Sequence, residues 1–123
     1  MPAARSVLIV DATHETRQVL RELVERVGAE PVAVARPEQA IALAVGAAPD
    51  LIVVDAESDA SAGQAATREL CEAAGRRDTP VLMLGGQAGS ESLVGGAAAI
   101  AKPYHYGPLA RKIQRLLESR RVA

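Results

Sequence analysis

The sequence of 123 residues has one cysteine, two tyrosines, and neither tryptophan nor phenylalanine. A single cysteine excludes an intramolecular disulfide, which is typical of chains that fold in a reducing compartment. Hydrophobic residues nevertheless make up 49% of the sequence. Any core must therefore be built almost entirely from aliphatic side chains.

The sequence also lacks a surplus of either charge, because its formal net charge is −1. Nucleic-acid-binding domains usually carry a basic surplus or stripe, so we expect no nucleic-acid partner. No apolar run approaches the ~20 residues that span a membrane. The first residues, Met1 to Arg5, lack the apolar stretch of a secretory signal. We therefore expect a cytoplasmic protein, without membrane contact, that forms a single domain over residues 1–123.

Two short apolar runs each end in an aspartate. Residues 49–55 read Pro-Asp-Leu-Ile-Val-Val-Asp, and residues 6–10 read Ser-Val-Leu-Ile-Val ahead of Asp11. Runs this short and this apolar predict buried strands of a parallel sheet. Ligands of open α/β sheets bind at the carboxyl ends of the strands, where Asp11 and Asp55 would lie. Two carboxylates at that edge suit a hard cation, or a phosphoryl group held through one.

Strand and helix patterns alternate along the whole chain. This alternation predicts a parallel α/β sheet with helices on both faces. We expect Thr13 to be the N-cap of the first helix and Pro37 to begin the second, with Ile41, Ala44 and Val45 buried. The expected strands are 6–10, 32–35, 49–55, 80–84 and 97–101, and the expected helices are 16–27, 37–45, 64–74 and one that buries Leu109, Ile113, Leu116 and Leu117.

Four motifs occur together in a fixed order. They are Val7–Asp11, Pro49–Asp55 with Gly63 eight residues further on, Thr79–Leu84 and Ala101–Tyr104. Taken together, they resemble the receiver domain of two-component response regulators over nearly the whole chain. The resemblance implies a flavodoxin-like three-layer αβα sandwich with strand order 2-1-3-4-5.

The resemblance also implies roles for four residues. Asp55 matches the aspartate that accepts a phosphoryl group from a histidine kinase, and aspartate carboxylates form such covalent intermediates. Asp11 matches an acidic residue that helps to hold Mg²⁺ together with Asp55. Glu57 matches the position whose backbone carbonyl completes the metal site, and Lys102 matches the lysine that pairs with the phosphoryl oxygens.

Three positions depart from the family pattern. Ala12 stands where a second acidic residue is usual, so we expect weak Mg²⁺ binding. Gly85 stands where a serine or threonine usually bonds the phosphoryl group, and Ala99 stands where an aromatic switch residue is usual. The interval from Gly85 to Lys102 is also short, which predicts a shortened fourth helix, largely replaced by the loop from Gly85 to Gly96.

These departures predict an atypical receiver domain that is a signalling module and not an enzyme. We expect weak or absent phosphorylation at Asp55, a histidine kinase or another signalling protein as partner, and a monomer or weak homodimer. The expected contact surface combines the fifth strand, the last helix and the loop from Gly85 to Gly96. Two alternatives stay open: a fully active Mg²⁺-dependent phosphoacceptor that hydrolyses its own aspartyl phosphate, and the receiver part of a larger regulator with an output domain.

Simpler interpretations of single residues also stay open. Lys102 would neutralise Asp11 and Asp55 without any phosphate, and Asp11 would serve as an acid near the start of the first helix. We expect His14 at the rim of the pocket to be solvated. His105 has no second ligand at metal-site spacing and Cys71 is expected to pack as a small hydrophobic residue.

Overall fold

The computed structural model describes residues 5–55, 63–85, 98–100 and 104–119 of the chain. A parallel sheet of five strands, in the order β2-β1-β3-β4-β5, forms the middle layer. The strands are β1 (Ser6–Val10), β2 (Glu30–Val34), β3 (Leu51–Asp55), β4 (Val81–Leu84) and β5 (Ala98–Ile100). The helices are α1 (His14–Arg26), α2 (Pro37–Gly46), α3 (Gly63–Arg76) and α4 (Tyr106–Ser119). This confirms the predicted α/β class and the strand order.

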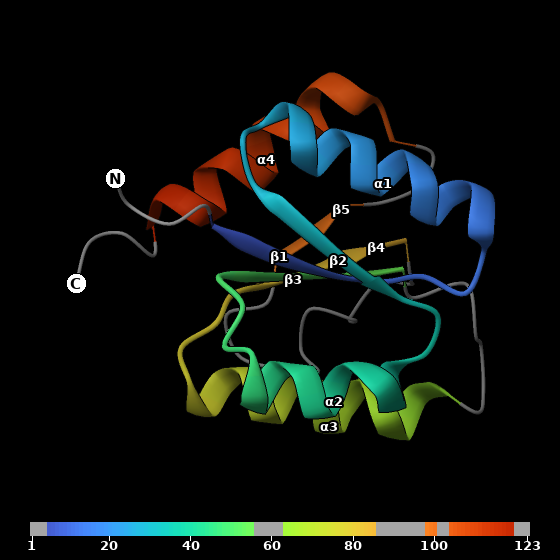
Figure 1. The fold of residues 1–123 in the computed structure, drawn as a ribbon, viewed down its shortest axis with the longest axis vertical. Coiled ribbons are helices and arrows are strands. Elements are labelled where there is room, and N and C mark those ends of the chain that lie inside the picture. Colours follow the sequence, from blue (N-terminus) through green and yellow to red (C-terminus); the bar gives the residue numbers. More distant parts are fainter. Residues whose placement is uncertain (1–4, 56–62, 86–97, 101–103, 120–123) are drawn as a thin grey trace.

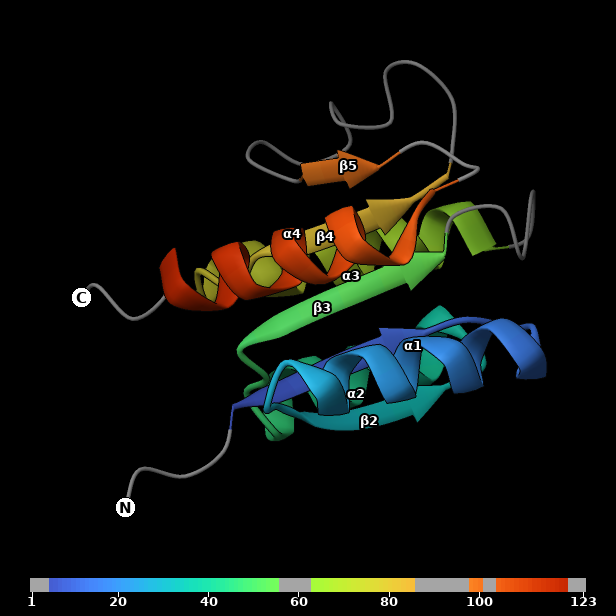
Figure 2. The same ribbon diagram turned by 90° about the horizontal axis from the view of Figure 1, so that it is seen from above.

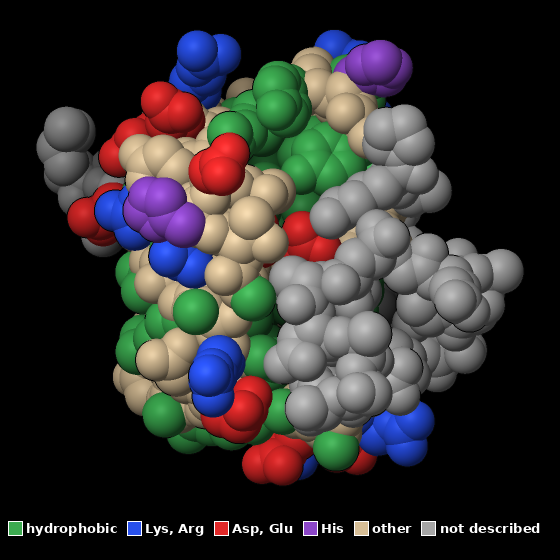
Figure 3. Space-filling view, turned by 90° about the vertical axis from the view of Figure 1, so that its right-hand side faces the viewer, with side chains coloured by type: hydrophobic (Ala, Val, Ile, Leu, Met, Phe, Trp, Pro, Cys, Tyr) green, Lys and Arg blue, Asp and Glu red, His purple; other side chains and the backbone are tan. Residues whose placement is uncertain are grey.

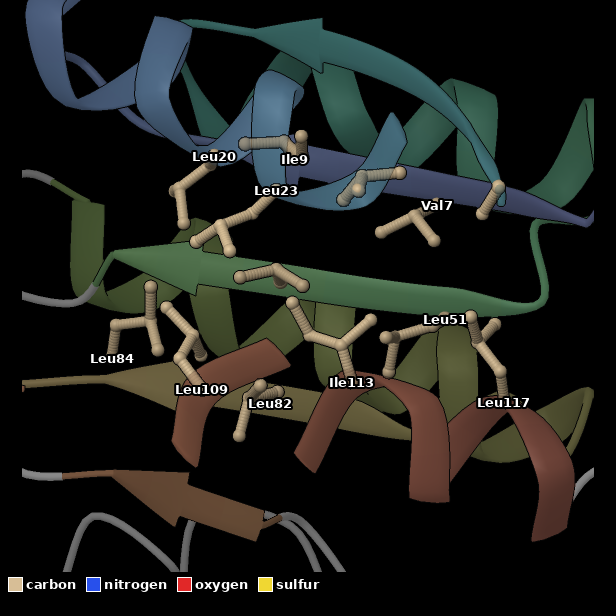
Figure 4. Packing of buried hydrophobic residues seen from close by; sticks show 13 residues of the cluster. Val7, Ile9, Leu20, Leu23, Leu51, Leu82, Leu84, Leu109, Ile113 and Leu117 are labelled. Atoms are coloured by element: carbon tan, nitrogen blue, oxygen red, sulfur yellow. The ribbon is translucent and has the colours of Figure 1, made fainter. Parts of the chain in front are cut away.

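Helices cover both faces of the sheet. Figure 1 shows α1 and α4 on one face and α2 and α3 on the other, and Figure 2 shows the strands side by side. Successive side chains of a strand point to opposite faces, so the apolar strands feed two separate cores. On the α1 and α4 side the core includes Val7, Ile9, Leu20, Leu51, Val53, Leu82, Leu84, Leu109, Ile113 and Leu117 (Figure 4). On the other side it includes Leu8, Val10, Ala40, Ala44, Ile52, Val54, Leu70, Cys71 and Met83.

The last helix was predicted well because its apolar side chains recur every four residues. Leu109, Ile113 and Leu117 are buried, and Leu116 packs against the same core with part of its surface exposed. At the end of α4, the guanidinium of Arg5 donates a hydrogen bond to the carbonyl of Leu117. The residue just ahead of β1 is thereby joined to the last turn of the last helix.

Several predicted boundaries were wrong by about two residues. Helix α1 begins at His14 instead of residue 16, although Thr13 is the N-cap as predicted. Strand β2 begins at Glu30 instead of residue 32 and contains Pro31. Because β2 lies at the edge of the sheet, it tolerates the missing proline donor, which the sequence pattern had not revealed. Helix α3 extends to Arg76, past the predicted end at residue 74.

The prediction for α2 was wrong for Val45, and Ile41 is only partly buried. Pro37 opens the helix as expected, and Ala44 is buried, but Val45 is 45% exposed. The buried face is formed by Pro37, Ala40 and Ala44, which lie three and four residues apart. One further residue turns the side chain by ~100° around the helix axis, and this carries Val45 away from the sheet.

Some predictions fall outside the described part of the chain. The shortened fourth helix was expected between Gly85 and Lys102, and residues 86–97 are not described. Among the residues that are described, no helix has the length and apolar content needed to cross a bilayer.

Candidate functional site

Two aspartates leave the sheet side by side at its carboxyl edge. Asp11 and Asp55 directly follow Val10 and Val54, which are partners in the β1–β3 pairing. Neighbouring strands lie ~4.8 Å apart, so this register brings the two residues to one place. Asp11 is fully buried and Asp55 is only 5% exposed. Figure 3 looks onto this edge and shows an acidic side chain near its centre, next to hydrophobic ones.

Hydrogen bonds join Asp11 to several elements around the site. Its backbone N–H donates to the carbonyl of Val34 in β2 at 3.1 Å. Its carboxylate Oδ1 accepts from the backbone N–H of Thr13 at 2.9 Å. Its own carbonyl accepts from Nη1 of Arg17 in α1 at 2.9 Å. Asp11 therefore binds the backbone of the N-cap residue instead of capping the helix itself, and it is tied to β2, to the loop and to α1.

The side chain of Arg17 makes a second contact at the rim of the site. Its Nη2 lies 3.3 Å from Nδ1 of His14. Arginine only donates hydrogen bonds, so Nδ1 of His14 must accept this one. His14 is exposed, as predicted. No sequence pattern singles out Arg17 as the residue that turns back to the end of β1, because the arginines of this helix look alike in sequence.

The β4 side of the site ends in a glycine. Gly85 is buried, has φ +77° and donates its N–H to the carbonyl of Ile100 in β5 at 2.8 Å. Residues with a side chain rarely adopt this left-handed backbone region. The position where a serine or threonine was expected by family pattern therefore lacks the hydroxyl and also has a backbone conformation that disfavours one. Next to Asp11, Ala12 is exposed and supplies no carboxylate.

The remaining predicted site residues are not described. Glu57 and Lys102 lie outside the described ranges, and for Ala99 only the backbone in β5 is given. Within the described part, no group of three or more histidine, cysteine or acidic side chains that would hold a metal is found. The two buried carboxylates fit Mg²⁺ nonetheless, because this ion is commonly held by one or two carboxylates and keeps several waters.

The lone cysteine lies away from this site. Cys71 is a residue of α3, and its side chain is buried in the core on the α2 and α3 side of the sheet, as predicted. Burial, together with the nearby charge of Glu72, raises the pKa of its thiol from 9.0 to about 11. The thiolate is the reactive form, so Cys71 is inert at neutral pH. His105 is exposed and contributes to neither core.

Comparison with known families decides what this arrangement is. The model of the response regulator receiver domain matches residues 7–114. The chain belongs to this family. It is thus a receiver domain of the two-component type, a signalling module whose relatives interact with histidine kinases and typically bind Mg²⁺ in the active site.

Solved structures agree with the family assignment. A CheY-like receiver domain protein from Methanospirillum hungatei has a TM-score of 0.80 and 25% identity, covering 97% of this chain and 98% of that one. Chemotaxis protein CheY4 from Vibrio cholerae has 0.77 and 25%, covering 93% and 99%. The receiver domain of a sensor histidine kinase from Pseudomonas aeruginosa has 0.78 and 24%, covering 94% and 99%, and was solved with magnesium in its active-site cleft. Among curated proteins, no significant match is found.

Proposed function

We propose that this chain is an atypical receiver domain, with a retained acidic pocket, weak or absent phosphorylation at Asp55, and a role carried by protein–protein contacts. The observation that carries the proposal is the contrast at the pocket. Two buried carboxylates, Asp11 and Asp55, lie beside a β4 end where Gly85 has no hydroxyl and a left-handed backbone.

Asp11 and Asp55 would hold Mg²⁺, with the backbone carbonyl of Glu57 as a further predicted ligand. The bound ion would supply positive charge between the acceptor carboxylate and an incoming phosphoryl group. A carboxylate oxygen of Asp55 would form a bond to phosphorus while the phosphorus–nitrogen bond of a phosphohistidine breaks, and the histidine nitrogen would keep the electron pair. Lys102 is the predicted partner of the phosphoryl oxygens.

The residue next to Asp11 supports weak metal binding at this site. Ala12 removes a carboxylate next to Asp11, and fewer charged ligands lower the affinity for Mg²⁺. The receiver domain from Pseudomonas aeruginosa holds magnesium in its active-site cleft, which supports the location that we propose for the metal site. We therefore expect Mg²⁺ to bind here only at millimolar concentration.

The readout side supports the proposal as well. A phosphoryl charge acts by biasing an element with two stable arrangements. Gly85 offers no hydroxyl to draw toward that charge, and Ala99 has no ring to change its rotamer. A phosphoryl group on Asp55 would therefore cause little rearrangement of the side chains at these two positions.

The contact surface that we propose includes the start of α4. The rings of Tyr104 and Tyr106 lie 6.3 Å apart at an angle of 57°, and Tyr106 is 56% exposed. Aromatic residues are enriched in protein interfaces, and these are the two tyrosines of the whole sequence. A histidine kinase or another signalling protein is the partner we propose for this surface.

Phosphorylation by a small donor tests the proposal. The protein is incubated with Mg²⁺ and phosphoramidate, and its intact mass is followed over time, with Asp55→Asn as control. We expect slow, substoichiometric modification or none, and no modification of the control. Rapid, complete modification that depends on Mg²⁺ and is lost in the control would contradict the proposal and identify an active phosphoacceptor.

A further inference from the structure

The solvent side of α1 carries a row of charged residues. Glu15, Glu22 and Arg26 are all exposed, and their spacing of seven and four residues places them within ~40° of one another around the helix. From the start of α1 to its end, this row is negative, negative and positive. Beside it, the exposed Glu25 and the half-buried Arg21 lie four residues apart, where opposite charges offset each other.

The solvent side of α4 carries a second row with the opposite order of signs. Arg111, Arg115 and Glu118 are exposed, and their spacing of four and three residues places them within ~60° of one another. From the start of α4 to its end, this row is positive, positive and negative. The half-buried Lys112 adds a further positive charge beside it. Each row thus changes sign in the last turn of its helix, and the two rows are complementary in order.

The two helices are neighbours on one face of the sheet. Figure 2 looks onto this face and shows that α1 and α4 run in the same direction. Over the part of the chain that the structure describes, no ion pair or side-chain hydrogen bond is found for the six residues of the two rows. Arg17, the remaining arginine of α1, is half-buried and turned back to Asp11. The face therefore presents two complementary rows that do not pair with each other within the chain.

We propose that a second copy of this chain binds to this face, with α1 of each copy against α4 of the other. A two-fold axis that lies between the copies and parallel to the helices exchanges the two sides of the face and leaves the helix direction unchanged. Glu22 of one copy then faces Arg115 of the second copy, and Arg26 faces Glu118 of the second copy. Such an interface is isologous, so each of these contacts is made twice.

Charge complementarity favours a second copy as the partner, because the complement of each row is already present in the chain. The net charge of −1 adds little general repulsion between copies. At 1.5 Å per residue the rows span ~16 Å on α1 and ~10 Å on α4, and the long side chains of arginine cover the difference. Exposed ion pairs each contribute little free energy, and charges mainly set register. We therefore expect a weak dimer that is sensitive to salt.

Sedimentation equilibrium measures the dimerisation constant of the wild type and of charge-reversal variants. The variants are Glu22→Arg, Arg115→Glu and the two combined. Glu69→Arg is the matched control, because Glu69 is exposed, undergoes the same change of charge and lies in α3 on the opposite face of the sheet. Arg26→Glu, Glu118→Arg and their combination form a second set that tests the same register. Circular dichroism checks that each variant is folded.

Each single reversal sets like charges opposite each other at two places, so it should weaken dimerisation by ~10-fold or more. The combined variant restores opposite charges and should return to within ~3-fold of the wild type, while Glu69→Arg has no effect. Raising NaCl from ~0.05 M to ~0.5 M should also weaken the wild-type dimer. A wild type that stays monomeric up to ~1 mM would overturn the inference. So would a dimer that tolerates both single reversals, or a combined variant as weak as the single ones.

Discussion

The β1 side and the β4 side of the pocket are built in different ways. On the β1 side, Asp11 is held by bonds from β2, from the N-cap of α1 and from the guanidinium of Arg17. On the β4 side, the chain leaves the sheet through Gly85, whose backbone N–H bonds to Ile100 and which has no side chain to meet a ligand. In the function that we propose, the metal-binding side of the site is kept while the side chains of the readout are lost.

The largest expected effect comes from two core truncations, one on the β1 side of the site and one on the β4 side. Leu20 of α1 and Leu84 of β4 are both fully buried in the same core. Leu20→Ala and Leu84→Ala should each lower the free energy of unfolding by about 2–5 kcal/mol, because each leaves a cavity. Urea unfolding measures this loss.

The affinity for Mg²⁺ should distinguish these two variants. Leu20→Ala should weaken Mg²⁺ binding more than Leu84→Ala does, because α1 carries the arginine that anchors Asp11. Equal weakening by both variants would show that the two sides of the pocket do not differ in the way described.

Adding a hydroxyl-bearing side chain at position 85 should destabilise the fold and should not improve the binding of a phosphoryl group. Gly85→Thr forces a branched residue into φ +77° and should lower stability by about 1–2 kcal/mol. Thermal unfolding measures the loss, and beryllium fluoride binding tests whether the hydroxyl restores function. Gly28→Ala is the control for backbone strain alone, since Gly28 also has a positive φ and an added Cβ there would meet nothing within 4 Å. A stable Gly85→Thr variant with tighter beryllium fluoride binding would refute the argument.

Alkaline pH should weaken the fold through Cys71. The pKa of its thiol is about 11 when folded and near 9.0 when exposed, so the unfolded chain loses the proton first. The stability contributed by this thiol is therefore complete below pH 9 and is lost as the pH rises from 9 to 11, by about 1 kcal/mol at pH 10. Chemical unfolding at pH 8 and pH 10 measures the change.

The variant Cys71→Ala serves as the control for the alkaline effect. It should lose less stability than the wild type between the two pH values. Cys71 is a residue of α3 whose side chain is buried in the core, so its labelling by a thiol reagent reports global opening of the fold. A variant that loosens the structure only around Asp11 should leave the labelling rate unchanged.

The smallest expected effect is a gain in stability from a substitution just after α2, away from the candidate site. Ala48 follows α2 with φ 48°, a conformation that glycine adopts without strain. Ala48→Gly should raise stability by up to ~1 kcal/mol and leave Mg²⁺ binding unchanged. Ala47→Gly is the matched control, because Ala47 has φ −94° and gains no relief, so it should be neutral or destabilising. A destabilised Ala48→Gly variant would contradict the assignment of strain to Ala48.

Much of the fold follows from sequence patterns of short range. The apolar runs ending at Asp11 and Asp55 were enough to place both carboxylates at one edge, because parallel strands share their carboxyl ends. The four-residue recurrence of Leu109, Ile113 and Leu117 was enough to define the last helix. Thr13 was recognised as N-cap from its residue type.

Other features depend on contacts that no local pattern encodes. Val45 and Ala44 are both apolar, and only the packing of α2 on the sheet decides which of them is buried. The left-handed backbone of Gly85 is not visible in sequence, because glycine adopts either sign of φ with similar ease. The contact between Arg17 and Asp11 joins a helix to a strand end, so polar periodicity alone could not single out that arginine.

The most direct test of the central claim is amide NMR of the wild type, with Mg²⁺ added first and beryllium fluoride second. We predict saturable shifts at Asp11, Thr13 and Asp55 at millimolar Mg²⁺, and shifts with beryllium fluoride that stay at the pocket and do not reach α4. Tight binding accompanied by shifts that spread through β4 and β5 into Tyr106–Ser119 would contradict the claim. It would mean that binding and readout remain coupled despite Ala12 and Gly85.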